Sequence, residues 1–334
     1  MVASAEVPMS KTHLAPILPT LLAVLLLAGC HARVTGQSMG TTYTIEAECP
    51  HGIPAARVEQ VLDRVNRLMS TYDPDSELSE FNRHPVGEAM AVSPETVEVV
   101  AAARRVAEQT AGAFDPTVAP LVALWGFGAD AADHPPAEVE RRAAVETVDY
   151  RRVEHRTAPP TLRKLAPVTL DLSAIAKGYA VDRLAEVLDE SGCHAYLVEL
   201  GGEIRATGTA PGGGAWRIGV DAPTGTGLVS TIVLASGGLA TSGDYRQYRE
   251  QHGVRLSHVV DPRTGHPIRH DLASVTVVHE QAMYADAYAT ALLVMGEDEG
   301  RRFAEDNGLA ALFIVRRGQE FEVVDSSPMR EYLR

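Results

Sequence analysis

The chain has 334 residues, of which 45% are hydrophobic and 22% are charged, as in an ordinary globular protein of one large domain or two packed ones. Its formal net charge is −14, and it has no basic run with interleaved aromatic residues, so we expect no nucleic acid partner. A bound phosphate must therefore be held locally, by backbone N–H groups, a helix N-terminus or a metal ion.

The first feature along the chain is an apolar run at residues 14–29 that leads into Cys30. Two prolines, Pro16 and Pro19, interrupt it, and it is shorter than the roughly 20 apolar residues that a membrane-spanning helix needs. The run therefore predicts an export signal. Its ending, Leu-Ala-Gly-Cys, resembles a bacterial lipobox, in which the cysteine is acylated; an uncleaved signal anchor is the alternative.

These features predict how the chain is divided. We expect a lipoprotein signal peptide at residues 1–29, a tether lipidated on Cys30 at residues 30–35, and one functional domain at residues 36–330. The domain would be exported and held at a membrane surface by the lipid anchor. Two cysteines remain, Cys49 and Cys193, which either form a disulfide in an oxidising compartment or are both buried as free thiols.

The hydrophobic pattern predicts a mixed α+β fold. Ser93 and Pro94 form the start signal of one helix. A stretch rich in Asp, Pro and Arg, residues 129–166, is expected to be a variable excursion with a short helix. The expected helices are 55–69, 94–110, 174–190, 282–295 and 297–307, and the expected strands are 41–47, 168–172, 195–200, 216–220, 229–234, 257–260 and 274–278, with two more strands at the end.

Residues 36–40, Gly-Gln-Ser-Met-Gly, match the pattern of a serine hydrolase nucleophile. A nucleophile elbow needs a buried strand before the serine and a helix after it, whereas this match runs into a predicted strand. We therefore interpret it as a glycine-rich turn. Neither a dinucleotide-binding glycine fingerprint nor a P-loop occurs in the sequence.

Three other segments contain candidate ligand-binding or catalytic residues. Residues 171–182, DLSAIAKGYAVD, place Lys177 where a predicted strand meets a helix, so backbone N–H groups and an ammonium could face a diphosphate; a capped helix with a surface lysine is the commoner explanation. Asp286 and Thr290 share one helix face and suit Mg²⁺, or are simply solvated. His258 ends a predicted strand and could be a base or a structural ring.

Taken together and in order, eight blocks resemble the ApbE family of FAD:protein FMN transferases from Gly36 to about Met295. The resemblance implies a fold of two intimately packed α/β subdomains with the flavin site in the cleft between them. The blocks are GQSMGTTY, MSTYDPDSELSEFN, GAFDPTV, DLSAIAKGYAVD, GGEIRATG, SGDYRQY, SHVVDPRTG and ADAYATAL.

The resemblance also implies roles for individual residues. His258 and Asp286 would be catalytic. The residues that contact FAD would be Met39 and Tyr72 at the flavin, with Ala113, Phe114, Asp115, Asp171, Lys177 and Val260 around the remainder. The Mg²⁺ ligands would be the carbonyl oxygens of Ala174 and Ala289 and the side chains of Asp286 and Thr290. The chain departs from the family pattern at Glu199 and Glu203, which we leave out of the expected site.

The implied reaction moves FMN from FAD to a threonine or serine hydroxyl of an acceptor protein and releases AMP, with Mg²⁺ as cofactor. The implied acceptor is a subunit of a membrane redox complex. Two alternatives use the same residues: hydrolysis of FAD to FMN and AMP, or a flavin carrier or assembly factor without catalysis. An activated diphosphate is of little use to a carrier, so the metal ligands favour an enzyme.

Overall fold

A computed structural model describes residues 30–128, 136–244, 248–251 and 254–333. Its elements are β1 Cys30–Ser38, β2 Thr41–Cys49, α1 Ala55–Met69, α2 Glu77–Arg83, β3 Ala89–Ala91, α3 Pro94–Gln109, α4 Ala119–Leu124, α5 Glu138–Val145, β4 Val153–Thr157, β5 Pro160–Lys164, α6 Ala176–Glu190, β6 Ala195–Leu200, β7 Glu203–Thr207, β8 Trp216–Asp221, β9 Leu228–Leu234, β10 Ser236–Gly243, β11 Tyr248–Gln251, β12 Val254–Ser257, β13 Val260–Asp261, β14 His266–Pro267, β15 Leu272–His279, α7 Ala282–Asp306, β16 Ala310–Arg317 and β17 Glu320–Asp325. The predicted mixed α+β fold is confirmed.

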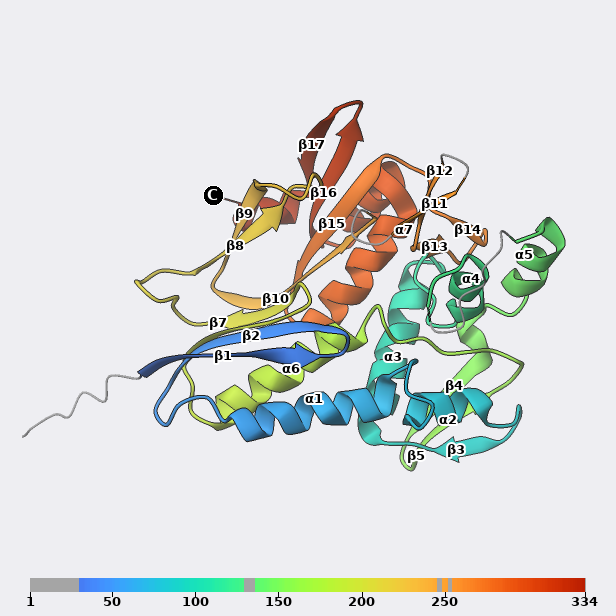
Figure 1. Cartoon of the computed structure of the whole chain (residues 1–334), viewed down its shortest axis with the longest axis horizontal. Helices are drawn as coiled ribbons and strands as arrows, with labels where there is room; N and C mark the ends of the chain where they lie inside the picture. The colour runs from blue at the N-terminus through green and yellow to red at the C-terminus, as the bar shows by residue number, and fades with distance from the viewer. Residues whose placement is uncertain (1–29, 129–135, 245–247, 252–253, 334) are drawn as a thin grey trace, which may run out of the picture.

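An eight-stranded antiparallel sheet forms the centre of the molecule, in the order β1-β2-β6-β7-β10-β15-β16-β17. Helices α1, α6 and α7 lie along one face of it (Figure 1), and the hairpin of β8 and β9 packs on the other face. Two apolar cores result: a large one between the sheet and the helices, and a smaller one under the hairpin. A second region, with α3, α4 and the small sheet β3-β5-β4, lies at one end of the helical layer.

Sequence periodicity explains the elements that build the large core. In β2 the alternate residues Tyr43, Ile45 and Ala47 are buried, as a strand with one face on a core requires. Helix α1 has the predicted bounds, and its buried residues recur at helical spacing. Helix α3 begins as predicted, with the Ser93 hydroxyl accepting a hydrogen bond from the Thr96 N–H and Pro94 in the first turn.

The serine hydrolase match forms a β-hairpin turn. Strand β1 ends at Ser38, Met39 and Gly40 both have positive φ (50° and 71°), and β2 starts at Thr41. Two such residues make the tight turn that suits the twist of paired strands. The interpretation of this match as a glycine-rich turn is confirmed. Residues 30–35, which we expected to be a tether, are paired with β2 throughout.

Two predicted strands are wrong. Residues 168–172 pair with no strand in the part of the chain that the structure describes; instead, the side-chain amide of Asn82 bonds both backbone groups of Leu170, at 2.8 Å each. The predicted strand 257–260 is broken in two, since the Ser257 hydroxyl accepts a hydrogen bond from the Val259 N–H and bends the chain. The region 129–166 also holds more structure than expected, with the strands β4 and β5 besides the helix α5.

The two helices predicted near the C-terminus form the long α7, which is kinked at Gly296 (φ 78°, ψ −175°). A side chain there would collide with His270, since an added Cβ would lie 2.9 Å from its ring. The predicted signal peptide, residues 1–29, lies outside the described residues. Among the described residues, no helix has the length and apolar character needed to cross a membrane.

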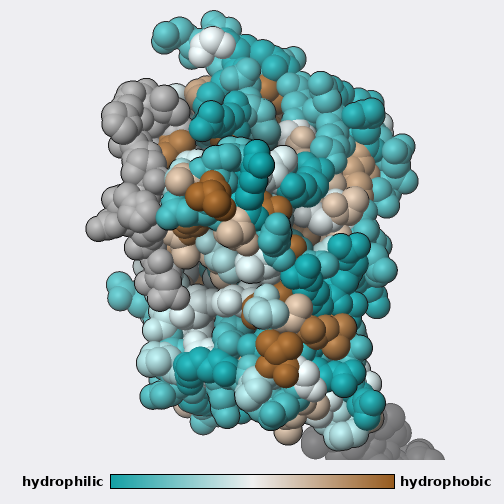
Figure 2. Space-filling model, turned by 90° about the vertical axis from the view of Figure 1, so that its right-hand side faces the viewer, coloured by the Kyte–Doolittle hydropathy of each residue, from teal (hydrophilic) through white to brown (hydrophobic). Residues whose placement is uncertain are grey.

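One end of the molecule shows how apolar residues are distributed on that part of the surface (Figure 2). Figure 2 shows the end of the molecule near α5 as mostly hydrophilic, with hydrophobic residues in small separate groups. Scattered exposed apolar residues are normal for a globular protein. The large apolar side chains exposed among the described residues are Tyr72, Val86, Val139, Leu165, Leu228 and Val323.

A buried disulfide joins Cys49, at the end of β2, to Cys193, in the turn between α6 and β6. It decides the question that the sequence left open. It ties the helical layer to the sheet over a sequence separation of 144 residues. Such a bond is typical of proteins from oxidising compartments.

We predict that replacing both Cys49 and Cys193 with serine lowers the free energy of unfolding by about 2–5 kcal/mol, because the unfolded chain loses a long closed loop. Urea unfolding with and without a reductant measures this. The wild type should lose stability in reductant and the double variant should not. Equal curves for both proteins in the absence of reductant would contradict the prediction.

Candidate functional site

The candidate site lies where the first turn of α6 meets the first turns of α7. The two helices touch here, because a Cβ added at Gly178 would lie 2.4 Å from the carbonyl oxygen of Ala282. Only glycine permits this approach. The Gly178 N–H donates a hydrogen bond of 3.1 Å to the carboxylate of Asp286, a residue that is buried with 3% exposure.

Asp182 fixes the relative position of these two helices. Its carboxylate accepts hydrogen bonds from the N–H groups of Ala282 and Met283, at 3.0 and 2.9 Å. The N-cap residue of α7, Gln281, makes no side-chain capping bond. The Asp182 carboxylate on α6 caps the helix in its place by accepting hydrogen bonds from the first N–H groups of α7. Asp286 and Thr290, one and two turns further along α7, are placed by this contact.

Lys177 forms an ion pair with Glu203, the first residue of β7, at 2.5 Å. Glu203 is 3% exposed, and burial together with the charge of Asp286 raises its pKa to about 8, whereas Lys177 opposes that shift. Burial also raises the pKa of Asp286, and Lys177 again opposes the shift. One ammonium is therefore shared between two buried carboxylates. The sequence interpretation left Glu203 out; its place directly after Gly201 and Gly202 was the available signal.

Three of the predicted metal ligands, Asp286, Ala289 and Thr290, lie in the first turns of α7. The hydroxyl of Thr290 is 2.9 Å from that of Ser242 on β10, a residue that the sequence did not single out. Ala174 lies in the turn before α6, where the Asp171 carboxylate accepts a hydrogen bond of 2.8 Å from the Ser173 N–H. The described residues contain no cluster of three or more His, Cys, Asp and Glu side chains suited to a metal.

A hard cation nevertheless fits this donor set. Among the described residues, the Oε2 atom of Glu203 is buried without a hydrogen-bond partner. The pKa values of Glu203 and Asp286 are both raised, so one ammonium does not fully stabilise their ionised forms, and a bound cation would stabilise those forms further. Carboxylate, hydroxyl and carbonyl oxygens are the ligands that Mg²⁺ takes in proteins.

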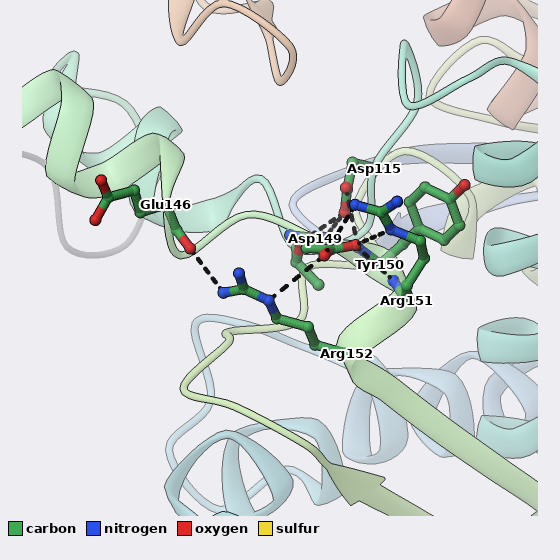
Figure 3. A network of polar contacts seen from close by, with 7 residues as sticks. Asp115, Glu146, Asp149, Tyr150, Arg151 and Arg152 are labelled. Atoms are coloured by element: carbon green, nitrogen blue, oxygen red, sulfur yellow. Dashed lines mark hydrogen bonds and ion pairs between the residues drawn. The ribbon is translucent and has the colours of Figure 1, made fainter.

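The expected cradle of Ala113, Phe114 and Asp115 lies beside Asp171, whose N–H donates a hydrogen bond of 2.7 Å to the carbonyl of Pro116. Figure 3 shows that the carboxylate of Asp115 points toward the backbone at Asp149 and Tyr150. It accepts hydrogen bonds from the N–H and hydroxyl of Thr117 and from the N–H of Tyr150. Burial raises its pKa, and these hydrogen bonds oppose the shift. Asp115 therefore shapes the loop, with its carboxylate oxygens already bonded.

The two predicted flavin contacts lie on neighbouring segments. Met39 is in the hairpin turn, and the preceding Ser38 accepts a hydrogen bond of 2.9 Å from Asn66 near the end of α1. Tyr72 is in the loop that follows α1 and is 72% exposed, so its ring is open to stacking by a flat molecule.

The predicted base, His258, lies just before the short strand β13. Strand β13 contacts α7, and the ring of His258 packs edge-on to that of Phe127 with centroids 6.3 Å apart. Val260 is buried in β13, where it pairs with Pro267. The structure therefore places Val260 in a strand that contacts the helix carrying Asp286, with His258 two residues before it.

A cavity of about 320 Å³ lies on the β8 side of the sheet. Its walls include Thr41 and Thr42, directly after the hairpin turn, and the paired glycines that precede Glu203. Gly201 packs so tightly that an added Cβ would lie 2.8 Å from Thr41. Glu199, the other departure from the family pattern, also lines the cavity and accepts a hydrogen bond of 2.9 Å from the Gly202 N–H.

Comparison with known proteins gives a consistent picture. The ApbE family profile matches residues 39–313. The FAD:protein FMN transferase of Vibrio cholerae is 41% identical over 331 residues, which cover 95% of this chain and 98% of that protein. The enzyme of the same name from Haemophilus influenzae is 40% identical over 312 residues, covering 89% and 90%.

Solved structures agree with the sequence matches. The flavin transferase ApbE from Vibrio cholerae has a TM-score of 0.84 and 40% identity, covering 91% of this chain and 100% of that one. The apo form of the flavinyl transferase ApbE from Pseudomonas stutzeri has a TM-score of 0.84 and 36% identity, covering 92% and 98%.

We predict that Asp182→Ala lowers the free energy of unfolding by about 1–3 kcal/mol, because two buried N–H groups at the start of α7 lose their acceptor. Glu186→Ala is the matched control, since this exposed residue of α6 forms an ion pair with Arg183 at the surface. Chemical unfolding of both variants is the measurement. Equal stability of the two variants would show that Asp182 does not hold the helices together.

Proposed function

The chain belongs to the ApbE family, and from this premise we infer that it is an FAD:protein FMN transferase. The observation that carries the inference is the group that Lys177 forms with the buried carboxyl groups of Glu203 and Asp286 at the contact of α6 and α7. This group offers an ammonium and oxygen ligands to a diphosphate and a cation. We further propose that the acceptor group is a serine or threonine hydroxyl and that the reaction requires Mg²⁺.

In the proposed reaction the acceptor oxygen attacks the phosphorus on the FMN side of the diphosphate. The bond from that phosphorus to the AMP oxygen breaks, and AMP leaves. Lys177 balances negative charge on the phosphates, which is the main form of catalysis in phosphoryl transfer. His258 is our candidate for removing the proton of the acceptor hydroxyl. Tyr72 and Met39 would hold the flavin.

Asp286, Thr290 and the carbonyl oxygens of Ala174 and Ala289 are the proposed Mg²⁺ ligands. When bound, the cation would neutralise charge on the diphosphate and orient it. The fit rests on the enclosed Asp286 carboxylate and on the unpartnered oxygen of Glu203 in the part of the chain that the structure describes.

The reaction is tested with the domain that follows Cys30, FAD, Mg²⁺ and candidate acceptor proteins. We expect an acceptor that stays fluorescent in a denaturing gel and gains the mass of FMN less water, with AMP formed in equal amount. Hydrolysis would instead give AMP and free FMN, and a carrier would give neither product. Accumulation of free FMN with no labelled protein across several acceptors would overturn the transferase proposal.

We predict that Asp286→Ala lowers FMN transfer at least about 100-fold, because the charged ligand of the proposed cation is lost. Asp306→Ala, an exposed change near the end of the same helix, is the control. Mg²⁺ should raise the unfolding temperature of the wild type and the control, but not that of Asp286→Ala. Unchanged transfer by Asp286→Ala, or by wild type with excess chelator, would contradict a role for the metal.

We predict that His258→Ala still binds FAD but transfers FMN about 100- to 10,000-fold more slowly, the usual contribution of a general base. FAD titration followed by flavin fluorescence, together with single-turnover kinetics, separates the two effects. If FAD affinity falls in step with the rate, His258 contacts or shapes the cofactor site and is not the base.

We also propose that the domain is exported and anchored by a lipid on Cys30. The buried disulfide between Cys49 and Cys193 supports an oxidising compartment. A membrane anchor would raise the local concentration of enzyme at a membrane-bound acceptor, such as a redox-complex subunit.

We predict that Cys30→Ala, expressed from the full-length chain, yields folded and active protein that no longer fractionates with membranes, because the acylated residue is absent. Cell fractionation with a mass measurement of the mature N-terminus is the assay. Continued membrane association of Cys30→Ala would show that the apolar run, rather than a lipid, is the anchor.

A further inference from the structure

Glu203 is neither a proposed metal ligand nor a proposed FAD contact, yet it is 3% exposed and pairs with Lys177 at 2.5 Å. It begins β7 directly after the Gly201–Gly202 turn and faces α6 from the sheet, while the next residue, Ile204, belongs to the small core on the other face. The turn is held by a hydrogen bond of 3.1 Å from the Gly201 N–H to the carbonyl of Thr42. The backbone therefore gives Glu203 little freedom to move.

Burying these charged groups costs free energy of folding. Removing two charges from water costs several kcal/mol each, and their mutual attraction recovers that only with good geometry and further hydrogen bonds. Glu203 has one oxygen, Oε2, buried without a partner among the described residues, and Asp286 adds a second negative charge nearby. Groups kept at such a cost are more often part of a functional site than of a stabilising core.

We propose that Glu203 is a positioning residue that holds the ammonium of Lys177 in line with Asp286 for a diphosphate; this rests on the proposed function. Lys177 and Gly178 are adjacent in the first turn of α6. Glu203 binds the side chain of the first, and Asp286 binds the N–H of the second. Two carboxylates thus fix this turn from two sides, and a long flexible lysine is left with one orientation.

The distance of 2.5 Å between Lys177 Nζ and Glu203 Oε1 makes this a charge-assisted hydrogen bond, whose loss would let the ammonium swing toward solvent. Binding of a phosphate-containing ligand would then suffer, whereas binding of the flavin ring would not. That difference distinguishes a positioning role from a general structural one.

The test measures the affinity of the purified domain for FAD and for riboflavin, which has no phosphate, in buffer with Mg²⁺. For Glu203→Gln we expect FAD affinity to fall about 10- to 100-fold, as is usual when a supporting partner is removed, while riboflavin affinity is unchanged. In a Lys177→Met background the same substitution should change FAD affinity less than about 2-fold, because the group that it positions is gone. Glu186→Gln, which breaks an exposed ion pair on the same helix, should bind both ligands as wild type does.

Three results would overturn the proposal: wild-type FAD affinity in Glu203→Gln, an equal loss for riboflavin, or an undiminished loss in the Lys177→Met background. If Glu203→Gln does not fold, Glu203→Asp keeps the charge, shortens the side chain and gives the same FAD and riboflavin comparison. FMN transfer by the wild type is assayed in parallel. Its absence would overturn the proposed function, while the binding comparison would still decide the role of Glu203.

Discussion

The close contact between α6 and α7 is the constraint on which the site depends. Gly178 lets the helices touch, and Asp182 binds the start of α7 in place of a local cap. With the helices fixed, Lys177 and Asp286 lie in one buried region, opposite Glu203 from the sheet. The buried disulfide adds a second tie between this helical layer and the sheet.

Electrostatics connects this packing to the chemistry. A buried region with two carboxylates and one ammonium favours a cation and disfavours a lone anion, so FAD would enter most readily together with Mg²⁺. The net charge of −14 also disfavours binding of a free diphosphate, because it repels another anion. Local groups must therefore bind the phosphates, which agrees with a transferase whose substrate is a dinucleotide.

Much of the fold could be predicted from local patterns. The helix bounds at 55–69 and the cap at Ser93 depend on neighbours in the sequence, and both are confirmed. The strand expected at 168–172 is wrong because Asn82, distant in sequence, takes the backbone hydrogen bonds of Leu170. The break after Ser257 depends on one side chain that competes with the strand pairing.

The same limit applies to the site. The motif around Lys177 and the pair of Asp286 and Thr290 could be recognised because each is contiguous on a helix. Glu203 was left out because it departs from the family pattern, and its place after Gly201 and Gly202 does not by itself show which face of the sheet it occupies. The motif around Asp115 could be recognised from the sequence, but the direction of the Asp115 carboxylate depends on its hydrogen bonds to Thr117 and Tyr150.

The most direct test of the central claim is a crystal structure of the domain with FAD and Mn²⁺ in place of Mg²⁺, using anomalous scattering to locate the metal. We expect a Mn²⁺ peak at Asp286 and Thr290, with the FAD diphosphate between that peak and the ammonium of Lys177. A diphosphate bound away from Lys177 and Asp286, or Mn²⁺ bound at other residues only, would contradict the account.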